Sequence, residues 1–301
     1  MWEYLSQFTT WRPYEHKVLA HRWTAGTLPF NLNTLQCLFP AAQAEALTQK
    51  LLNTYGYNSK VPILKLRQQS DPMLLELAQF VYEKVFLGYT TKMWGLTPEQ
   101  LSPAVTARVP VLVGHDDRYF QDTYQAMPAA GYTALFEQLL DHPAIQVRTG
   151  VDFFALRPKL TARQIFYTGP IDAYFDYCYG RLPYRSLEFV HQQLPAQARF
   201  QPTGTVNYPN DHAYTRITEF KYLTGQDLPG TSTVTEYPRA EGEPYYPIPN
   251  DANEALYKRY QALAERENGV SFVGRLARYR YYNMDQCVAA ALVAVKADTP
   301  L

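Results

Sequence analysis

The spacing of apolar residues changes along this chain from a helical to a strand pattern and back, which limits it to a mixed architecture. From residue 34 to about 107, apolar residues recur at intervals of three and four, and this predicts a layer of helices. One helix is predicted to begin at the capping residue Asp71, with Pro72 in its first turn. Its expected apolar face consists of Leu74, Leu75, Ala78, Val81, Tyr82 and Val85.

A strand pattern follows a proline-bounded apolar run at 109–113. Between Tyr184 and Tyr246, apolar and polar residues alternate in short runs broken by Pro, Gly and Asn, as at 203–208 and 232–237. Such alternation is typical of strands with one buried face. We therefore expect an antiparallel sheet here.

Segments of α/β character flank the predicted sheet. Before it we expect a helix at 132–140 and strands at 144–148 and 165–167. After it we expect a helix at 252–266 with a stop at Gly269, a strand at 271–273 and a helix from about residue 284. The outer helices are predicted to bury Leu135, Phe136 and Leu139, and Cys287, Val288, Ala291, Leu292 and Val295. The fold class is α/β, or mixed α+β, with α/β pieces split by a helical insertion and an antiparallel sheet domain.

Charge and hydropathy exclude several classes of protein. Lys plus Arg and Asp plus Glu number 28 each, so no net field attracts nucleic acid or an anionic membrane. No apolar run reaches the roughly 18 residues of a membrane span. The first residues lack the layout of a signal peptide, so we expect a cytoplasmic protein.

Metal and hydrolase sites are not supported. Cys37, Cys178 and Cys287 are far apart and lack metal-ligand spacing, so we expect buried thiols. The six histidines show no HExxH pattern, and no GxSxG elbow occurs. No two of the 15 glycines are separated by a single residue, so a GxGxxG phosphate loop is also absent.

Two kinds of residue could bind a nucleotide diphosphate. In the segment 88–95, GYTTKMWG, Tyr89 and Trp94 lie between two glycines and could sandwich a base; the alternative is a helix end with two packing aromatics. Arg108 and Arg216 stand in polar and aromatic surroundings, and two guanidinium groups could hold a pyrophosphate. The alternative, which is the more common role of a single arginine, is a surface or structural ion-pair residue.

Tyrosine-rich segments supply further candidates. Tyr246 lies in a Tyr-Tyr-Pro run, and the segment 279–286 leads directly into a predicted helix. A helix start attracts anions such as a phosphate or a flavin carbonyl. The alternative is a plain cap by Asn283 or Asp285, preceded by packing tyrosines.

These segments together resemble the UDP-galactopyranose mutase family over nearly the whole chain and in one colinear order. The resemblance implies a flavin-dependent isomerase that interconverts UDP-galactopyranose and UDP-galactofuranose through a flavin N5–sugar adduct, with reduced FAD as the active form. It also implies a homodimer and a role in galactofuranose supply for cell-surface polysaccharide. The segments that carry it are YEHKVLA, LPFNLNT, GYTTKMWG, ARVPV, RYFQDTYQAMPAAGYTAL, YTGPIDAYFDY, YRSLEF, YTRITE, TEYP, EPYYPIP and GRLARYRYYNMDQ.

The resemblance assigns roles to individual residues. Arg108 and Arg216 match the catalytic arginines that clamp the diphosphate as UDP departs. The other substrate-binding positions are His16, Tyr89, Thr90, Trp94, Tyr119, Asn207, Tyr246 and Tyr281. The FAD-binding positions are Phe153, Arg275, Tyr282, Asn283, Met284, Asp285 and Gln286, with Asn283 where the family more often has Asp.

The resemblance also implies a domain organisation. Residues 1–33 would connect the sheet and FAD domains, and 34–107 would form a helical substrate domain with a mobile loop. Residues 108–130 and 184–250 would form the antiparallel sheet domain, and 131–183 and 251–301 the remaining α/β pieces of a Rossmann-like FAD domain. The strand, GxGxxG loop and helix with which the family begins have no counterpart here, so we expect a truncated mutase that is inactive by itself and binds FAD weakly or not at all.

Two alternatives stay open. One is a non-catalytic UDP-sugar-binding protein that has lost its flavin site. The other is an amine-oxidase-like flavoprotein, which would share the split α/β and sheet architecture but not the GYTTKMWG and YTRI segments.

Overall fold

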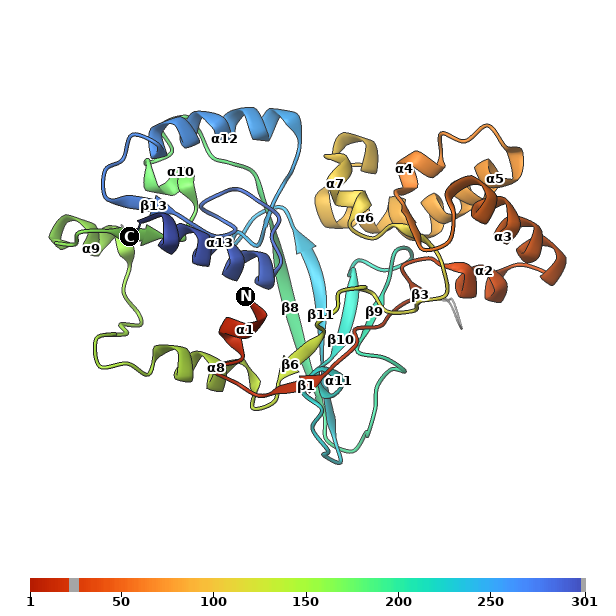
Figure 1. Ribbon diagram of the computed structural model, residues 1–301, viewed down its shortest axis with the longest axis horizontal. Coiled ribbons are helices and arrows are strands. Elements are labelled where there is room, and N and C mark those ends of the chain that lie inside the picture. Colours follow the sequence, from red (N-terminus) through yellow and green to blue (C-terminus); the bar gives the residue numbers. More distant parts are fainter. Residues whose placement is uncertain (22–26, 299–301) are drawn as a thin grey trace. The chain divides into compact units, whose positions relative to one another are not determined.

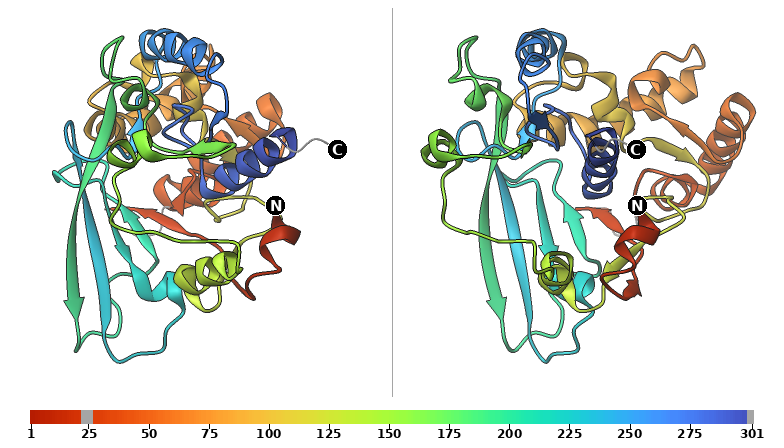
Figure 2. Two further views of the ribbon diagram at one scale, coloured as in Figure 1. Left: turned by 90° about the vertical axis from the view of Figure 1, so that its left-hand side faces the viewer. Right: turned by 60° about the vertical axis from the view of Figure 1, so that its left-hand side comes forward.

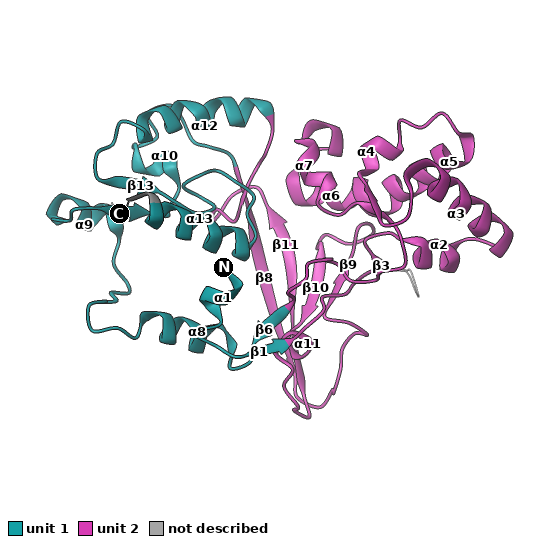
Figure 3. Ribbon diagram, in the orientation of Figure 1, with its two compact units in different colours: residues 1–12, 126–183, 251–301 teal, residues 13–125, 184–250 magenta. Residues whose placement is uncertain are grey.

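The computed structural model describes residues 1–21 and 27–298. It divides the chain into two units, and each unit is assembled from segments that are distant in the sequence (Figure 3). Unit 1 contains residues 1–12, 126–183 and 251–301, and unit 2 contains 13–125 and 184–250. Most of the predicted substrate-side residues fall in unit 2.

A seven-stranded sheet forms the frame of unit 2. The order of its strands is β12-β8-β11-β10-β9-β2-β3, and neighbours are antiparallel except for β2 and β9. The strands are β2 (Val18–Ala20), β3 (Thr27–Leu28), β8 (Tyr184–Leu194), β9 (Thr205–Asn207), β10 (Arg216–Glu219), β11 (Thr231–Arg239) and β12 (Tyr246–Pro247). The long strands β8 and β11 run side by side in both views of Figure 2. The predicted antiparallel region is confirmed, whereas the parallel partner β2 was not expected.

A group of helices completes unit 2 (Figure 1). They are α2 (Leu32–Leu38), α3 (Ala41–Tyr55), α4 (Ile63–Leu66), α5 (Pro72–Val81), the π-helix η1 (Tyr82–Leu87), α6 (Gly88–Trp94), the 3-10 helix η2 (Pro98–Gln100), α7 (Pro103–Ala107) and, after β10, α11 (Phe220–Thr224). The predicted helical layer is confirmed. The sequence pattern missed one short strand within it, β4 (Ser59–Val61), because its partner β5 (Val111–Val113) lies about fifty residues away.

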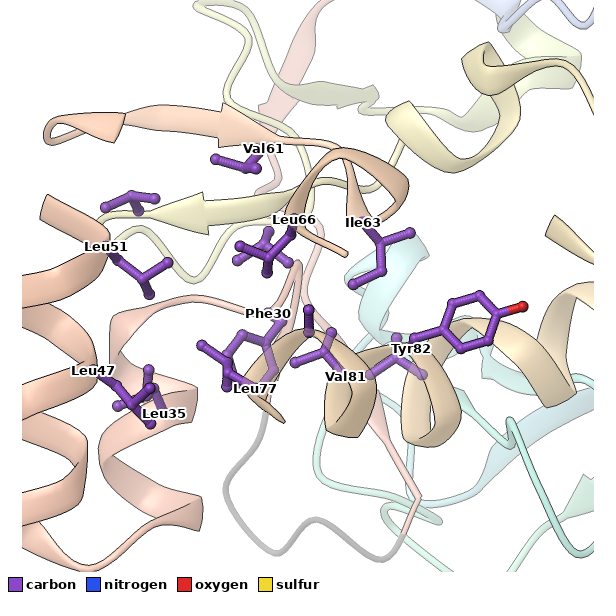
Figure 4. Packing of buried hydrophobic residues seen from close by; sticks show 14 of the residues in the cluster. Phe30, Leu35, Leu47, Leu51, Val61, Ile63, Leu66, Leu77, Val81 and Tyr82 are labelled. Atoms are coloured by element: carbon purple, nitrogen blue, oxygen red, sulfur yellow. The ribbon is translucent and has the colours of Figure 1, made fainter. Parts of the chain in front are cut away.

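Helix α5 shows why this layer forms where it does. The Asp71 carboxylate accepts hydrogen bonds from the backbone N–H groups of Met73 and Leu74, and Pro72 occupies the first position, as predicted. Leu74, Val81 and their neighbours on the same face enter the core shown in Figure 4. One position of the expected face is wrong, because Leu75 is 44% exposed. It follows Leu74 by one residue and so points about 100° away from it.

Unit 1 contains a short parallel strand pair, β7 (Ile165–Tyr167) and β13 (Val270–Phe272). Its other elements are α1 (Trp2–Leu5), the paired strands β1 (Trp11–Pro13) and β6 (Ala126–Pro128), α8 (Gly131–Leu140), α9 (Phe153–Leu156), the 3-10 helix η3 (Arg157–Lys159), α10 (Ile171–Tyr174), α12 (Asp251–Ala264) and α13 (Met284–Asp298). The fold class, a mixed α/β chain, is therefore confirmed.

Several predictions for unit 1 are wrong. Residues 144–148 form no strand and are exposed, because a strand needs a hydrogen-bonded neighbour and the described part of the chain places none beside them. Phe136 on α8 is 57% exposed and Val295 on α13 is 51% exposed, although both were expected to be buried. Ala291 is exposed as well. Apolar periodicity identified these helices but not which of their apolar residues are covered.

The cysteine prediction is also wrong. Cys37 and Cys178 are exposed and Cys287 is half-buried. Within the described residues, no group of three or more His, Cys, Asp or Glu side chains could hold a metal ion. No helix found in the ranges 1–21 and 27–298 has the length and apolarity to cross a bilayer.

Candidate functional site

Three polar residues lie in a row across the middle strands of unit 2. Arg216 on β10 is the Cα partner of Asn207 on β9 and of Glu236 on β11. Residues directly opposite each other on paired strands project to the same face of a sheet. The row therefore presents an amide, a guanidinium and a carboxylate side by side.

Arg216 and Glu236 form an ion pair within this row. The Nε atom of Arg216 lies 2.8 Å from Oε2 of Glu236, and the two side chains are 31% and 10% exposed. An arginine held through Nε keeps its terminal nitrogens directed away from the carboxylate, where they can meet a second anion. The pair thus orients Arg216 while leaving part of its side chain accessible.

Two tyrosines complete the surroundings of Arg216. Its Nη2 atom donates a hydrogen bond of 3.3 Å to the hydroxyl of Tyr246 on β12. Burial acts to lower the pKa of Arg216, but Tyr89, Glu236 and Tyr246 outweigh it and raise the pKa well above its usual value. Arg216 is therefore a permanent cation held among aromatic hydroxyls.

Helix α6 carries the predicted aromatic residues of the nucleotide site. Thr90 and Trp94 are buried, and the ring of Trp94 meets that of Tyr246 edge-on at a centroid distance of 6.1 Å. Tyr89 is half-buried on the same helix and is close enough to Arg216 to affect its pKa. The helix ends at Gly95, whose φ of +70° is left-handed and suits glycine. Tyr89, Trp94, Arg216 and Tyr246 thus form one cluster.

His16 joins this cluster from the segment before β2. Its Nδ1 atom is 2.9 Å from the hydroxyl of Tyr14, and its ring lies edge-on to that of Tyr119 at 5.6 Å. The backbone N–H of Tyr119 also donates to the His16 carbonyl at 2.7 Å. Burial and the nearby charge of Arg216 lower the pKa of His16 to about 4, so the imidazole is neutral at pH 7.

Arg108 has a different local setting. It ends α7 in a helical conformation and is half-buried, and α7 lies in the same unit as Arg216. The structure thus links His16, Tyr89, Trp94, Asn207 and Tyr246 to Arg216. Arg108 lies at a helix end of the same unit.

The residues predicted to meet FAD lie in unit 1. Phe153 packs with Tyr167 and Tyr174 in a small aromatic core, at centroid distances of 5.0 and 6.2 Å. The guanidinium carbon of Arg275 is 4.8 Å from the ring centroid of Tyr281. Tyr281, predicted to contact substrate, therefore lies beside a residue predicted to contact the cofactor.

A side-chain hydrogen bond at the start of α13 involves Gln286, which was not among the capping residues expected from the sequence. The side chain of Gln286 accepts a hydrogen bond of 2.8 Å from the backbone N–H of Asn283, and the N–H of Cys287 donates to the Asn283 carbonyl. Tyr282 is half-buried just before the helix. Met284, Asp285 and Gln286 in its first turn are exposed, so this helix end is open to a ligand.

Sequence reasoning missed three residues that organise the site. Glu236 was only one polar position in an alternating strand, and its pairing with Arg216 depends on strand register. Arg185 on β8 donates from Nε to the carbonyl of Met93 at 2.8 Å. Lys92 on α6 donates to the carbonyls of Tyr208, His212 and Tyr214. Burial lowers the pKa of Lys92 to about 8, against the opposing charge of Asp211, so it is still mainly cationic at pH 7.

Comparison with known proteins identifies the family. The family model for UDP-galactopyranose mutase matches residues 84–281. The chain is 37% identical over 298 residues to a probable UDP-galactopyranose mutase of Klebsiella pneumoniae, covering 97% of this chain and 76% of that protein. It is 31% identical to a dTDP-fucopyranose mutase of Escherichia coli, covering 97% of this chain and 79% of that protein.

Solved structures give the same picture at the level of the fold. A crystal structure of reduced UDP-galactopyranose mutase superposes with a TM-score of 0.65 at 14% identity, covering 99% of this chain and 82% of that one. A putative protoporphyrinogen oxidase from an Exiguobacterium species reaches 0.56 at 12% identity, covering 97% and 82%. The sequence matches extend over the segments that hold Arg216, Tyr246 and Trp94. The chain therefore belongs to the UDP-galactopyranose mutase family.

Proposed function

We propose that this chain binds a uridine diphosphate sugar in unit 2 and, with reduced FAD, interconverts UDP-galactopyranose and UDP-galactofuranose. The observation that carries the proposal is the setting of Arg216, a partly exposed guanidinium oriented by Glu236 and Tyr246 beside the aromatic residues of α6. Family membership supplies the reaction class.

Arg216 is suited to a diphosphate that departs and returns. Negative charge on the diphosphate grows as its bond to the sugar breaks, and a guanidinium already in place stabilises the charged state most. Because Glu236 engages the Nε edge, Arg216 does not have to be reoriented during the reaction. Arg108 is proposed as the second diphosphate clamp.

The remaining residues of the cluster would bind the nucleotide and sugar. Tyr89, Thr90 and Trp94 on α6 would contact the nucleotide. The ring of Tyr89 is half-buried and can stack on the uracil at little entropic cost, because a flat ring loses little freedom. Neutral His16 can donate or accept a hydrogen bond without adding to the charge of Arg216. Tyr119, Asn207 and Tyr246 would bind the sugar or diphosphate through their hydroxyl and amide groups. Tyr281, which belongs to unit 1 and not to this cluster, is proposed as a further substrate contact.

The residues of unit 1 fit part of a flavin site. The first turn of α13 is exposed, and the free N–H groups of a helix start suit a phosphate or a flavin carbonyl, although Asp285 opposes an anion there. Asn283, Gln286 and the aromatic core around Phe153 would border the cofactor, with Arg275, Tyr282 and Met284 beside them. When bound, reduced FAD would supply the nucleophile for the sugar without net redox change.

The sequence contains no glycine-rich loop of the kind that binds the pyrophosphate of a dinucleotide. None of its glycines are arranged as GxGxxG, the loop that brings a backbone close to a pyrophosphate. We therefore propose that these 301 residues bind FAD weakly by themselves. Unit 1 would supply the residues that meet the cofactor and unit 2 most of those that meet the substrate, in a cytoplasmic homodimer.

A nucleotide titration and a spectrum test the proposal. UDP added to the purified chain is expected to bind more tightly than ADP, with dTDP as a third ligand because a relative is named for a dTDP sugar. FAD added under reducing conditions, followed by chromatography of UDP-galactose products, tests the reaction. Lack of UDP binding would refute the site in unit 2.

The same experiment separates a second candidate function. Tight UDP binding by a colourless protein that never takes up flavin would support a non-catalytic UDP-sugar-binding protein. This alternative would rest on the Arg216 cluster alone, which needs no glycine loop to hold a nucleotide diphosphate.

A further inference from the structure

The helix that carries Tyr89 and Trp94 is fastened at its carboxyl end by an arginine of the sheet. Arg185 on β8 donates from Nε to the carbonyl of Met93 at 2.8 Å and from Nη2 to the carbonyl of Lys92 at 3.2 Å. The last carbonyls of a helix lack partners within the helix. A guanidinium that caps two of them both stabilises the helix end and determines where it lies.

A second cation fastens the same helix to the loop between β9 and β10. The ammonium group of Lys92 donates to the backbone carbonyls of Tyr208, His212 at 2.9 Å and Tyr214 at 3.0 Å. Three carbonyls match the three donors of an ammonium group. Arg185 and Lys92 are called the cationic clasp below.

Close packing at the start of α6 tightens this connection. A Cβ atom at Gly88 would lie 2.4 Å from both the carbonyl oxygen of Pro209 and Oδ1 of Asn210. Asn210 also donates from Nδ2 to the carbonyl of Lys84 in the π-helix η1 at 3.3 Å. Helix α6 therefore contacts the 208–214 loop at its beginning and through Lys92, and it contacts β8 at its end.

The clasp reaches the nucleotide site through Tyr246. Arg185 and Tyr246 are Cα partners on β8 and β12, so their side chains share a face. The ring of Tyr246 meets Trp94, and its hydroxyl accepts from Arg216. A shift of α6 relative to β8 would therefore move Trp94 away from Tyr246 and change the space beside Arg216.

We propose that Arg185 and Lys92 are positioning residues. They place α6 so that Tyr89 meets a nucleotide base and Trp94 keeps Tyr246 beside Arg216, which meets the diphosphate. This inference rests on the proposed function of the site in unit 2. Neither residue has to touch the ligand. Their effect is to keep the aromatic side chains in place before the nucleotide arrives, which lowers the entropic cost of binding.

Two measurements on the full chain test the clasp. The first is the affinity for UDP by calorimetry, and the second is backbone hydrogen exchange of residues 88–95 without ligand. The variants are Arg185→Met and Lys92→Met, which keep the aliphatic stems, and Arg185→Lys, which keeps the charge but loses the planar fork. Lys221→Met is the matched control, since Lys221 is a buried lysine that donates to the carbonyls of Ala198 and Leu228 away from α6.

The clasp predicts a specific pattern of results. Arg185→Met and Lys92→Met should each weaken UDP binding about tenfold and accelerate exchange in 88–95, while exchange in α3 stays unchanged. Arg185→Lys should recover part of the affinity, and Lys221→Met should leave it unchanged. If Arg185→Met does not fold, the UDP affinities of Arg185→Lys and Lys92→Met still test the proposed role of the clasp.

Other results would overturn the inference. If the clasp variants bind UDP as tightly as the unaltered chain, Arg185 and Lys92 stabilise α6 but do not affect nucleotide binding, even if hydrogen exchange in 88–95 accelerates. Equal losses of affinity in Lys221→Met would point to general destabilisation. If the unaltered chain does not bind UDP, the proposed function is refuted. If hydrogen exchange in 88–95 is also the same in the clasp variants as in the unaltered chain, Arg185 and Lys92 do not position α6.

Discussion

Arg216 and Glu236 face each other across β10 and β11, with the Nε atom of one 2.8 Å from Oε2 of the other. The side chain of Glu236 is 10% exposed and that of Arg216 is 31% exposed, so the arginine keeps more access to solvent than its partner does. This arrangement gives an arginine a fixed orientation without burying its whole charge. Such an arginine is preorganised to bind an anion.

Loss of the Arg216 guanidinium should weaken nucleotide binding. Arg216→Ala is expected to raise the Kd for UDP about tenfold to a hundredfold, because a hydrogen bond to a charged group contributes about 1.5–3 kcal/mol. Calorimetric titration measures the change. The control is Arg239→Ala, which removes an arginine paired with Glu188 on the exposed end of the same sheet and should leave the Kd unaltered. Equal losses in both variants would contradict a specific role for Arg216.

Turnover should depend on both arginines. In protein that carries reduced FAD and the complete cofactor site, Arg108→Ala or Arg216→Ala should each lower turnover by about two or more powers of ten. The physical reason is that the diphosphate carries most charge when its bond to the sugar breaks. Product formation followed by chromatography measures the effect. A change within about twofold would exclude a transition-state role for the altered arginine.

The carboxylate partner should matter for stability. Glu236→Gln keeps a hydrogen-bond acceptor near Arg216 but leaves its charge without a counter-ion, and we expect the free energy of unfolding to fall by about 1–3 kcal/mol. Urea denaturation monitored by circular dichroism provides the measurement. Glu188→Gln breaks an ion pair whose side chains are 51% and 52% exposed, so less than about 0.5 kcal/mol should be lost there. If the two variants lose similar free energies of unfolding, the ion pair of Arg216 and Glu236 contributes no more to stability than an exposed pair.

The hydroxyl of Tyr246 should contribute through Arg216. Tyr246→Phe keeps the ring that meets Trp94 but removes the acceptor of the 3.3 Å hydrogen bond. We expect UDP affinity to fall about threefold to tenfold, as for the loss of one neutral acceptor. Tyr245→Phe, at the neighbouring residue whose hydroxyl donates to Glu243, is the control and should not change affinity. If Tyr245→Phe lowers UDP affinity as much as Tyr246→Phe does, the loss comes from a disturbed strand and not from the Tyr246 hydroxyl.

Stability should fall in mild acid because of His16. Its pKa is about 4 in the folded chain and near 6.5 when exposed, so the unfolded chain binds more protons as the pH falls below 6.5. The free energy of unfolding should therefore drop by about 2 kcal/mol between pH 7 and pH 5. His16→Gln should remove this part of the pH dependence. The same slope in both proteins would show that other groups cause it.

The local elements followed from the sequence because their causes are local. The capping aspartate and first-turn proline of α5 and the hydrogen bond at the start of α13 depend on neighbours within a few residues. Long-range pairing did not follow in the same way. Strand β4 needs β5, and residues 144–148 are not a strand although they look like one, since only a neighbouring strand could have stabilised them.

The sequence by itself determined the family, through an ordered set of motifs, and it nominated Arg216, Tyr246 and Trp94. Only the tertiary structure decided which side chains meet. It paired Arg216 with Glu236, brought Arg185 to the end of α6, and lowered the pKa of His16 by burial beside a cation. Strand register and burial depend on residues far apart in the chain, and spacing along one sequence does not contain them.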